Sequence, residues 1–146
     1  MYKNVLVTVD GSENAEAILP FILQIAGPLD LNVILLRVNT PAAPEREQAA
    51  HLVSEVYLSQ LAQDIGERGL RVTTMVREGA PVETIVDAAR EANVDLIAMT
   101  THGRTGPSRL LFGSVAEGVL REAHVPVMLL KQTERDLERA REARPA

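Results

Sequence analysis

The sequence contains no cysteine and no tryptophan, and only two phenylalanines and two tyrosines among its 146 residues. Without cysteine the protein has no disulfide, no thiolate metal site and no cysteine nucleophile. Because aromatic residues are scarce, valine, isoleucine, leucine and alanine must build the core. The hydrophobic fraction of 46% rules against global disorder, and the length predicts a single globular domain.

An excess of basic residues is also missing, because 15 lysines and arginines stand against 20 acidic residues. General nucleic-acid binding needs a basic face that neutralises phosphates, so the net charge of -5 disfavours it. No apolar run reaches the length of a transmembrane helix, and the stretch MYKNVLVTVD lacks the pattern of a signal peptide. We therefore expect a cytoplasmic protein with neither a nucleic acid nor a membrane as its partner.

Short apolar runs alternate with segments of helical spacing. Several of the runs are apolar without a break, as is typical of strands covered on both faces. Strands are predicted at 4–9, 32–38, 71–76, 94–100 and 125–130. Four helical stripes lie between them: Ile18, Phe21, Ile22 and Ile25; Val53, Val56, Tyr57, Leu61 and Ile65; Val82, Ile85, Val86 and Ala89; Val115, Ala116, Val119, Leu120 and Ala123. This order predicts an α/β fold with a doubly wound parallel sheet and helices on both faces.

Three segments depart from the regular alternation. Pro20 falls inside the first helical pattern and should kink that helix or shift its start. Residues 39–48 hold two prolines and are predicted to be the longest irregular connection. The tail, 132–146, has four acidic residues, four arginines and few apolar ones, so we expect a frayed helix or disorder there, with partner binding as the minority alternative. The folded domain would then span 1–131.

The segment 101–120, THGRTGPSRLLFGSVAEGVL, joins a buried strand to a helix. Ligands of doubly wound sheets bind outside the carboxyl ends of the strands, where the strand order reverses. If the first strand is central, this segment flanks that crevice. A phosphate would need inward N–H groups and a positive field, which glycines and the first turn of a helix supply.

Gly103 and Gly106 would shape such a loop, and the amides of Gly113 and Ser114 would bind phosphate oxygens. Arg104, or Arg109 in its place, would add a charge-assisted contact. The alternative gives the glycines only turn conformations and makes Ser114 a plain N-cap. Spacing alone leaves both interpretations open. It does exclude a P-loop and a dinucleotide fingerprint.

Histidine offers no catalytic or metal centre by its pattern. His102 lies in the same loop without a recognisable serine–aspartate partner, so a loop-shaping hydrogen bond is the expected role. His51 and His124 have no metal-ligand spacing with it. We assign no catalytic residue.

The stretch MTTHGRTGPSRLLFGSVAEGVL, followed by HVPVMLLK, resembles the C-terminal signature of the universal stress protein family. NVLVTVDGSENAEAILPFILQIA, GAPVETIVDAA and DLIAMTTHG match the same family, so the resemblance spans 2–131. It implies a single sheet of five parallel strands in the order 3-2-1-4-5, of the adenine nucleotide alpha-hydrolase-like type. It also implies a homodimer.

One branch of the family binds ATP through a Gly-2x-Gly-9x-Gly-Ser/Thr motif, and this chain resembles that branch. Gly103, Gly113 and Ser114 fit the motif. Thr100 stands in place of the first glycine, and a β-branched residue restricts the chain there. The resemblance therefore implies ATP as the bound nucleotide.

The resemblance also implies roles for single residues. Asp10 would lie near the ribose or a bound Mg²⁺, although from the residues alone it serves equally as a turn residue that starts a helix. The main chain of Val38 would meet the adenine, and without the resemblance this residue is strand core. The remaining positions would form the crevice floor, lie beneath the loop or continue the helix that faces the phosphates: Thr8, Val9, Met99, Val115 and Ala116.

Several functions stay open. The first is an ATP-binding regulatory protein of the stress response, with slow or no hydrolysis. The alternatives are a weak ATPase or autophosphorylating enzyme, a nucleotide-free dimeric interaction protein, and a protein that binds a cyclic nucleotide. Residues 125–130, with Pro126 near their start, are predicted to form an edge strand that pairs with its copy. A monomer whose tail covers that edge is the competing interpretation.

Overall fold

The computed structural model of the protein describes residues 2–101, 113–131 and 142. The elements follow one another as β1 (Asn4–Thr8), α1 (Glu13–Glu16), α2 (Leu19–Ala26), β2 (Asn32–Asn39), α3 (Pro44–Gly66), β3 (Arg71–Glu78), α4 (Pro81–Glu91), β4 (Leu96–Thr101), α5 (Ser114–Glu122) and β5 (Val127–Lys131). Within the described part of the chain, no helix is long and apolar enough to span a bilayer. The tail, for which a frayed helix or disorder was predicted, lies outside the described residues apart from Glu142.

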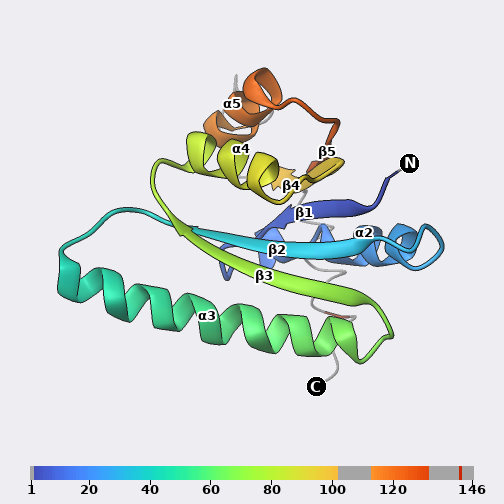
Figure 1. Ribbon diagram of the computed structural model, residues 1–146, viewed down its shortest axis with the longest axis horizontal. Helices are drawn as coiled ribbons and strands as arrows, with labels where there is room; N and C mark the ends of the chain where they lie inside the picture. Colours follow the sequence, from blue (N-terminus) through green and yellow to red (C-terminus); the bar gives the residue numbers. More distant parts are fainter. Residues whose placement is uncertain (1, 102–112, 132–141, 143–146) are drawn as a thin grey trace.

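The described strands form one parallel sheet in the order β3-β2-β1-β4-β5 (Figure 1). β1 is central, with Val7 opposite Leu35 of β2 and Leu6 opposite Ile97 of β4. From β1 the chain builds outward to β3, and it then crosses back to add β4 and β5 on the other side. The predicted fold class and strand order are confirmed, and the order reverses beside β1.

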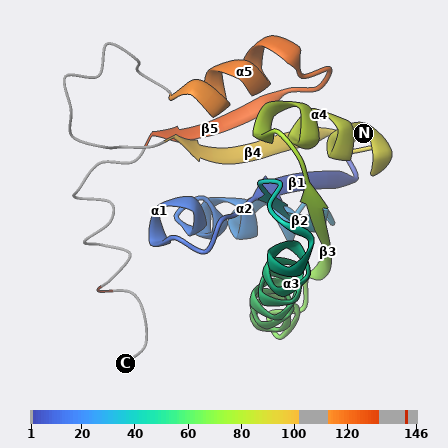
Figure 2. The same cartoon turned by 90° about the vertical axis from the view of Figure 1, so that its left-hand side faces the viewer.

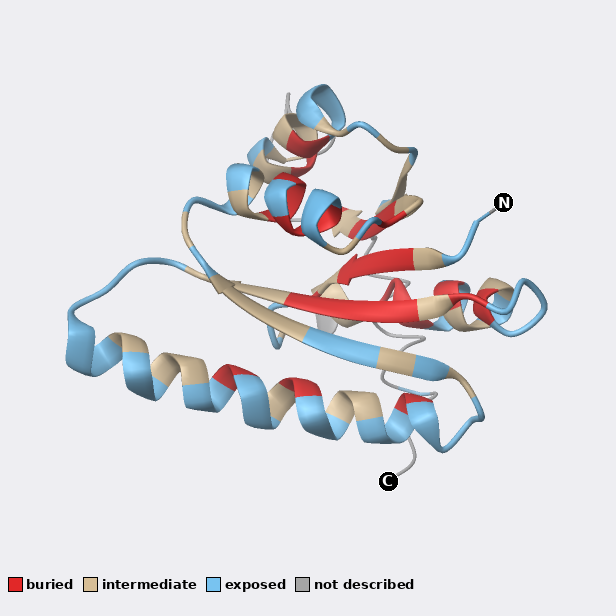
Figure 3. Cartoon of the chain, in the orientation of Figure 1, coloured by how far each residue is buried: buried red, intermediate tan, exposed pale blue. Residues whose placement is uncertain are grey.

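Alternating residues of the inner strands supply two separate cores. Val5 and Val7 pack with residues of α2 and α3, whereas Leu6 packs with residues of α4 and α5, and all three are fully buried. Figure 2 shows α1, α2 and α3 on one side of the sheet and α4 and α5 on the other. The buried segments in Figure 3 gather on the inner strands and on the helix faces turned toward them. Aliphatic residues fill both cores, as the scarcity of aromatic residues predicts.

Pro20 shifts the start of a helix, which is one of its two predicted effects. α2 begins at Leu19 and holds Pro20 in its first turn, where a missing N–H leaves no intrahelical bond unmade. The separate short helix α1 precedes it. Phe21, placed on the buried stripe from its spacing, is 51% exposed instead.

The prediction of an irregular connection over 39–48 is wrong for its second half. α3 begins at Pro44, so only residues 40–43 lie between β2 and the helix. Proline suits the first helical position, and two acidic residues of the first turn favour the positive end of the helix dipole. Glu47 also accepts a hydrogen bond from the backbone N–H of Ala42 at 3.3 Å. Pro44 therefore starts this helix, and Pro41 lies in the short connection before it.

The stripe predicted for α3 is also wrong in part. Tyr57, Leu61 and Ile65 pack on the core, but Val53 and Val56 are 61% and 63% exposed. The buried face is completed by Ser54 and Leu58. Leu120 of α5, likewise placed on a buried stripe, is 44% exposed. Apolar residues extend around these helices beyond the face that the sheet covers, so the spacing alone does not decide which of them are buried.

Asp95 fastens the amino end of β1. Its Oδ2 accepts hydrogen bonds from the backbone N–H groups of Lys3 at 2.7 Å and Asn4 at 2.9 Å. These bonds, the one from Asn4 first, hold the pKa of Asp95 below its ordinary value of 3.8. A lowered folded-state pKa means that the carboxylate stabilises the protein above pH 3.8 and that this contribution is lost as the pH falls through the folded value.

We expect Asp95→Ala to lower the free energy of unfolding by about 1 kcal/mol at neutral pH, because an exposed charged hydrogen bond contributes about that much. Urea unfolding at pH 7 and at about pH 3 measures the difference from the wild type, which should shrink at the acidic pH. Asp64→Ala, on the exposed side of α3, is the control. A difference that stays constant with pH would contradict the role given to the charge.

A candidate nucleotide site at the carboxyl ends of the strands

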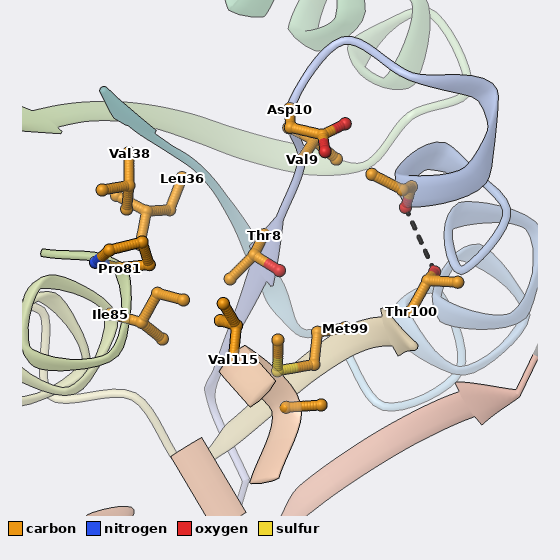
Figure 4. Close-up of a pocket in the computed structure, with 12 residues that line it drawn as sticks. Thr8, Val9, Asp10, Leu36, Val38, Pro81, Ile85, Met99, Thr100 and Val115 are labelled. Carbon is orange, nitrogen blue, oxygen red and sulfur yellow. Dashed lines mark hydrogen bonds between the residues drawn. The ribbon is translucent and has the colours of Figure 1, made fainter. Parts of the chain in front are cut away.

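A cavity of about 200 Å³ lies at the carboxyl ends of β1, β2 and β4. The start of α4 and the start of α5 close it from the side (Figure 4). This is the place where the strand order reverses, and doubly wound sheets bind their ligands at such a point. Its lining residues come from elements far apart in the sequence: Thr8, Val9, Asp10, Ala15, Leu36, Val38, Pro81, Ile85, Met99, Thr100, Val115 and Ala116.

Eight of the residues predicted for the site line this cavity together: Thr8, Val9, Asp10, Val38, Met99, Thr100, Val115 and Ala116. Gly113 and Ser114 lie at the start of α5, next to Val115. Gly103, Arg104 and Gly106 lie outside the described residues, as do His102 and Arg109. The structure thus assembles the expected floor and walls, and the roles of the loop residues stay predictions.

The walls of the cavity are largely apolar. Leu36 and Val38 project from β2, Ile85 from α4, Met99 from β4 and Val115 from α5 (Figure 4). Such walls suit a flat apolar group such as a heterocyclic base, with a few polar groups at the rim to orient it.

Sequence reasoning missed four lining residues, namely Ala15, Leu36, Pro81 and Ile85. The period of two in a strand puts Leu36 on the same face as Val38, so Leu36 could have been predicted from the sequence. Pro81 and Ile85 lie four residues apart on one face of α4. Nothing in the sequence indicates that α4 approaches β2 closely enough to share the cavity.

Asp10 supplies an exposed carboxylate at the edge of the cavity. Its Oδ1 accepts hydrogen bonds from the backbone N–H of Ser12, at 2.9 Å, and from the Ser12 hydroxyl. The Ser12 hydroxyl in turn accepts a bond from the Ala15 N–H at 3.1 Å and so begins α1. Asp10 is therefore a turn residue that starts a helix and, at the same time, a carboxylate that lines the cavity.

Thr100 has a defined structural contact. Its hydroxyl donates to the backbone oxygen of Ala15 at 3.3 Å, drawn as the dashed line in Figure 4. The bond ties the end of β4 to α1 across the cavity wall. A glycine would lack this bond. Thr100 restricts the backbone more than glycine would, and its hydroxyl links two elements that line the site.

The start of α5 adjoins the cavity through Val115 and Ala116. Gly113, with φ 77° and ψ 157°, is the N-cap residue, so Ser114 is the first helical residue and the plain N-cap predicted as its alternative role is wrong. The first intrahelical bond runs from the Glu117 N–H to the Gly113 oxygen at 3.1 Å. The earlier N–H groups have no acceptor inside the helix, and they carry the positive end of its dipole. An anion at this end of the cavity would be stabilised.

The family model described as "Universal stress protein family" matches residues 1–131. This chain belongs to the universal stress protein family. It is 32% identical to the universal stress protein MJ0531 of Methanocaldococcus jannaschii over 93% of this chain and 86% of that protein. It is 28% identical to MJ0577 of the same organism over 90% and 96% of the two chains.

Solved structures of the family share the fold. The structure of MJ0577 is 26% identical and superposes with a TM-score of 0.75, covering 91% of this chain and 98% of that one. A universal stress protein solved in complex with cAMP is 23% identical, with a TM-score of 0.67 and coverages of 90% and 98%. At that identity the likeness shows the fold.

The residues described in this universal stress protein include no group of three histidine, aspartate or glutamate side chains arranged to hold a metal ion. Asp10 is the carboxylate among the cavity residues. A cation at Asp10 would need further oxygen ligands, because Mg²⁺ takes six. The phosphates of a bound nucleotide are the kind of group that completes such a set.

Proposed function

We propose that this universal stress protein binds ATP in the cavity and acts as a nucleotide-dependent regulatory module of the stress response, with slow or no hydrolysis. The observation that carries the proposal is the meeting, in one cavity, of apolar walls, the exposed Asp10 carboxylate and the start of α5. An adenine nucleotide has a part that suits each of these.

The adenine would lie between the apolar walls, with the main chain of Val38 along one edge. The Asp10 carboxylate would accept hydrogen bonds from the ribose hydroxyls or hold Mg²⁺ together with phosphate oxygens. The phosphates would extend toward the free N–H groups of α5, at Ser114 and its neighbours. Gly103, Arg104 and Gly106 would complete the phosphate site from the preceding loop.

The described residues of the cavity favour binding over efficient hydrolysis. A hydrolase must position the attacking water and stabilise the charge on the transferring phosphate. The described lining residues offer one carboxylate and two threonine hydroxyls, and no lysine, arginine or histidine is among them. We therefore infer a regulatory role, in which the nucleotide changes a surface that a partner protein recognises.

One alternative has a specific observation behind it. The Thr100 hydroxyl is already bonded to Ala15, which favours a nucleotide-free dimeric interaction protein with a structural threonine at this position. A cyclic nucleotide would also offer an adenine and a phosphate to the same cavity. A weak ATPase or autophosphorylating enzyme would require catalytic groups beyond the described lining.

Isothermal titration of the nucleotide-stripped protein with ATP and Mg²⁺, and separately with AMP and cAMP, tests the proposal. We expect saturable binding of ATP and its loss in Val38→Phe, which fills the adenine end of the cavity. Thr74→Phe, on an exposed position of β3, should bind like the wild type. No heat from ATP and no nucleotide released on denaturation would contradict the proposal, and tighter binding of cAMP would change the ligand assigned.

We also propose a homodimer in the cytoplasm, formed through β5. This strand is at the edge of the sheet, with Pro126 directly before it, and its Val127–Leu130 side chains are only half-buried. An apolar edge strand is protected when it pairs with a second copy across a two-fold axis. Light scattering on the titration sample gives the molar mass, and a monomer mass at micromolar concentration would rule out this pairing.

A further inference from the structure

A second cluster lies beneath the turn that carries Asp10, on the sheet face opposite the apolar walls. Arg37 of β2 points to this side, between the cavity residues Leu36 and Val38, which point to the other. The Arg37 guanidinium carbon lies 5.2 Å from the centre of the Tyr57 ring of α3, which is cation–π range. Arg37 thus stacks on a helix that contributes nothing to the described lining of the cavity.

Arg37 also packs against Gly11. A Cβ built on Gly11 would lie 3.4 Å from the Arg37 Nη1, and Gly11 has a φ of +89°, which side chains rarely adopt. Gly11 therefore lets the turn approach the guanidinium closely. In the same turn the Ser12 N–H bonds the Asp10 carboxylate. A contact that holds Gly11 in place therefore also holds its neighbour Asp10.

We propose that Arg37, held in place by the Tyr57 ring, is a positioning residue of the nucleotide site: it supports the Gly11 turn and so fixes the Asp10 carboxylate. The inference rests on the proposed function and extends it. It adds α3, through Tyr57, to the elements that determine the geometry of the site.

The charges around Tyr57 agree with this arrangement. Burial, and then the negative charge of Glu16, raise the pKa of Tyr57 above its ordinary value, and Asp10 contributes in the same direction. Arg37 opposes them, so its positive charge offsets two carboxylates gathered at one turn. The contact with Arg37 is made by the Tyr57 ring. The Glu16 side chain acts on the Tyr57 hydroxyl both by its charge and by a hydrogen bond, and each raises the pKa of Tyr57.

Amide hydrogen exchange of the ligand-free protein tests the support directly. In Arg37→Met we expect the amides of residues 11–16 to exchange about threefold to thirtyfold faster, the range that the loss of a partly buried cation–π contact gives. Tyr57→Leu should do the same, and Tyr57→Phe should have a smaller effect, because it keeps the ring beside Arg37 and loses only the interaction of the hydroxyl with Glu16. Arg71→Met, which removes an arginine paired with Asp30 at 3.1 Å, is the matched control.

Two exchange results would overturn the proposal. Unchanged exchange at residues 11–16 in Arg37→Met would show that the turn needs no support. Faster exchange at all amides alike would show that Arg37 contributes only to global stability.

Titration with ATP and Mg²⁺ then measures the effect of each substitution on the affinity of the site. We expect affinity to fall by about threefold to thirtyfold in Arg37→Met and Tyr57→Leu, to fall less in Tyr57→Phe, and to stay near the wild-type value in Arg71→Met. Faster exchange with unchanged affinity would overturn the positioning role. If the wild type itself binds no ATP, the proposed function fails, and the exchange data still decide whether Arg37 holds the turn.

Discussion

Replacing Gly113 with valine is expected to weaken ATP binding by about tenfold to a hundredfold, because its φ of 77° and ψ of 157° lie in a region almost restricted to glycine and a side chain there costs about 1–3 kcal/mol. The strain falls on the residue that caps α5. Its relief would move the first N–H groups of the helix, which are the groups we expect to hold the phosphates. Titration with ATP and Mg²⁺ measures the loss, and urea unfolding measures the accompanying loss of stability.

The control is a glycine of the same kind far from the cavity. Gly69 has a φ of +82° in the turn between α3 and β3, and a Cβ there would meet nothing within 4 Å. Gly69→Val should lower stability through the same kind of strain and leave the affinity for ATP unchanged. If Gly113→Val binds ATP as tightly as the wild type, the start of α5 takes no part in the site.

Gly118→Ala is expected to lower the free energy of unfolding by about 1–3 kcal/mol, the cost of inserting an atom into a packed interior. A Cβ at Gly118 of α5 would lie 2.6 Å from Cγ2 and 3.1 Å from Cγ1 of Val82 on α4. A β-branched side chain in a helix is held near one rotamer, so Val82 cannot turn away. The two helices, which lie side by side in Figures 1 and 2, would have to separate.

A double-mutant cycle with Val82→Ala isolates this contact. Alanine is the better helix former by about 1 kcal/mol, so Gly118→Ala should stabilise the protein once Val82 is shortened. Chemical denaturation of the four proteins gives the coupling energy between the two positions. We expect Gly118→Ala to destabilise the protein when Val82 is present and to stabilise it in the Val82→Ala background. A stabilising Gly118→Ala in the wild-type background would show that the helices tolerate the methyl group.

The contact between Gly118 and Val82 also affects the candidate site. Pro81 precedes Val82 and Ile85 follows it by one helical turn, and both line the cavity. A shift of α4 away from α5 would therefore widen the slot that we assign to the adenine. We expect Gly118→Ala to weaken ATP binding as well, and the double variant to recover it.

The order of strands and helices was predictable because short apolar runs alternate along the chain with segments of helical spacing. The apolar residues of the runs at 4–9 and 32–38 and of the helical stripe over 82–89 are buried or pack against the two cores, as their spacing indicates. The strand order came from the resemblance to the family, and the structure reproduces it. Strand order depends on which hydrophobic faces meet in three dimensions, and no local pattern encodes that.

The cavity residues that were predicted came from the resemblance to the family. Asp10, Thr100 and Val115 were named in this way, whereas Ile85 was assigned only to a helical stripe. Arg37 gave no signal either, because a single arginine inside an apolar strand does not show which side chains it contacts. Its role depends on Tyr57, 20 positions further along, and the stripe on α3 was itself predicted correctly only in part. Contacts between side chains of different elements decide both cases.

The central place of β1 has a consequence for the order in which the protein is made. β1 leaves the ribosome before the other strands of the sheet and can pair with β2 soon afterwards. Its other edge stays open until β4 emerges, since the bond from the Lys3 N–H to Asp95 spans 92 positions. At ordinary rates of translation that interval lasts about 5–20 s. For this time an apolar strand edge at the middle of the future sheet is exposed, and the nascent chain is most open to mispairing and to capture by chaperones then.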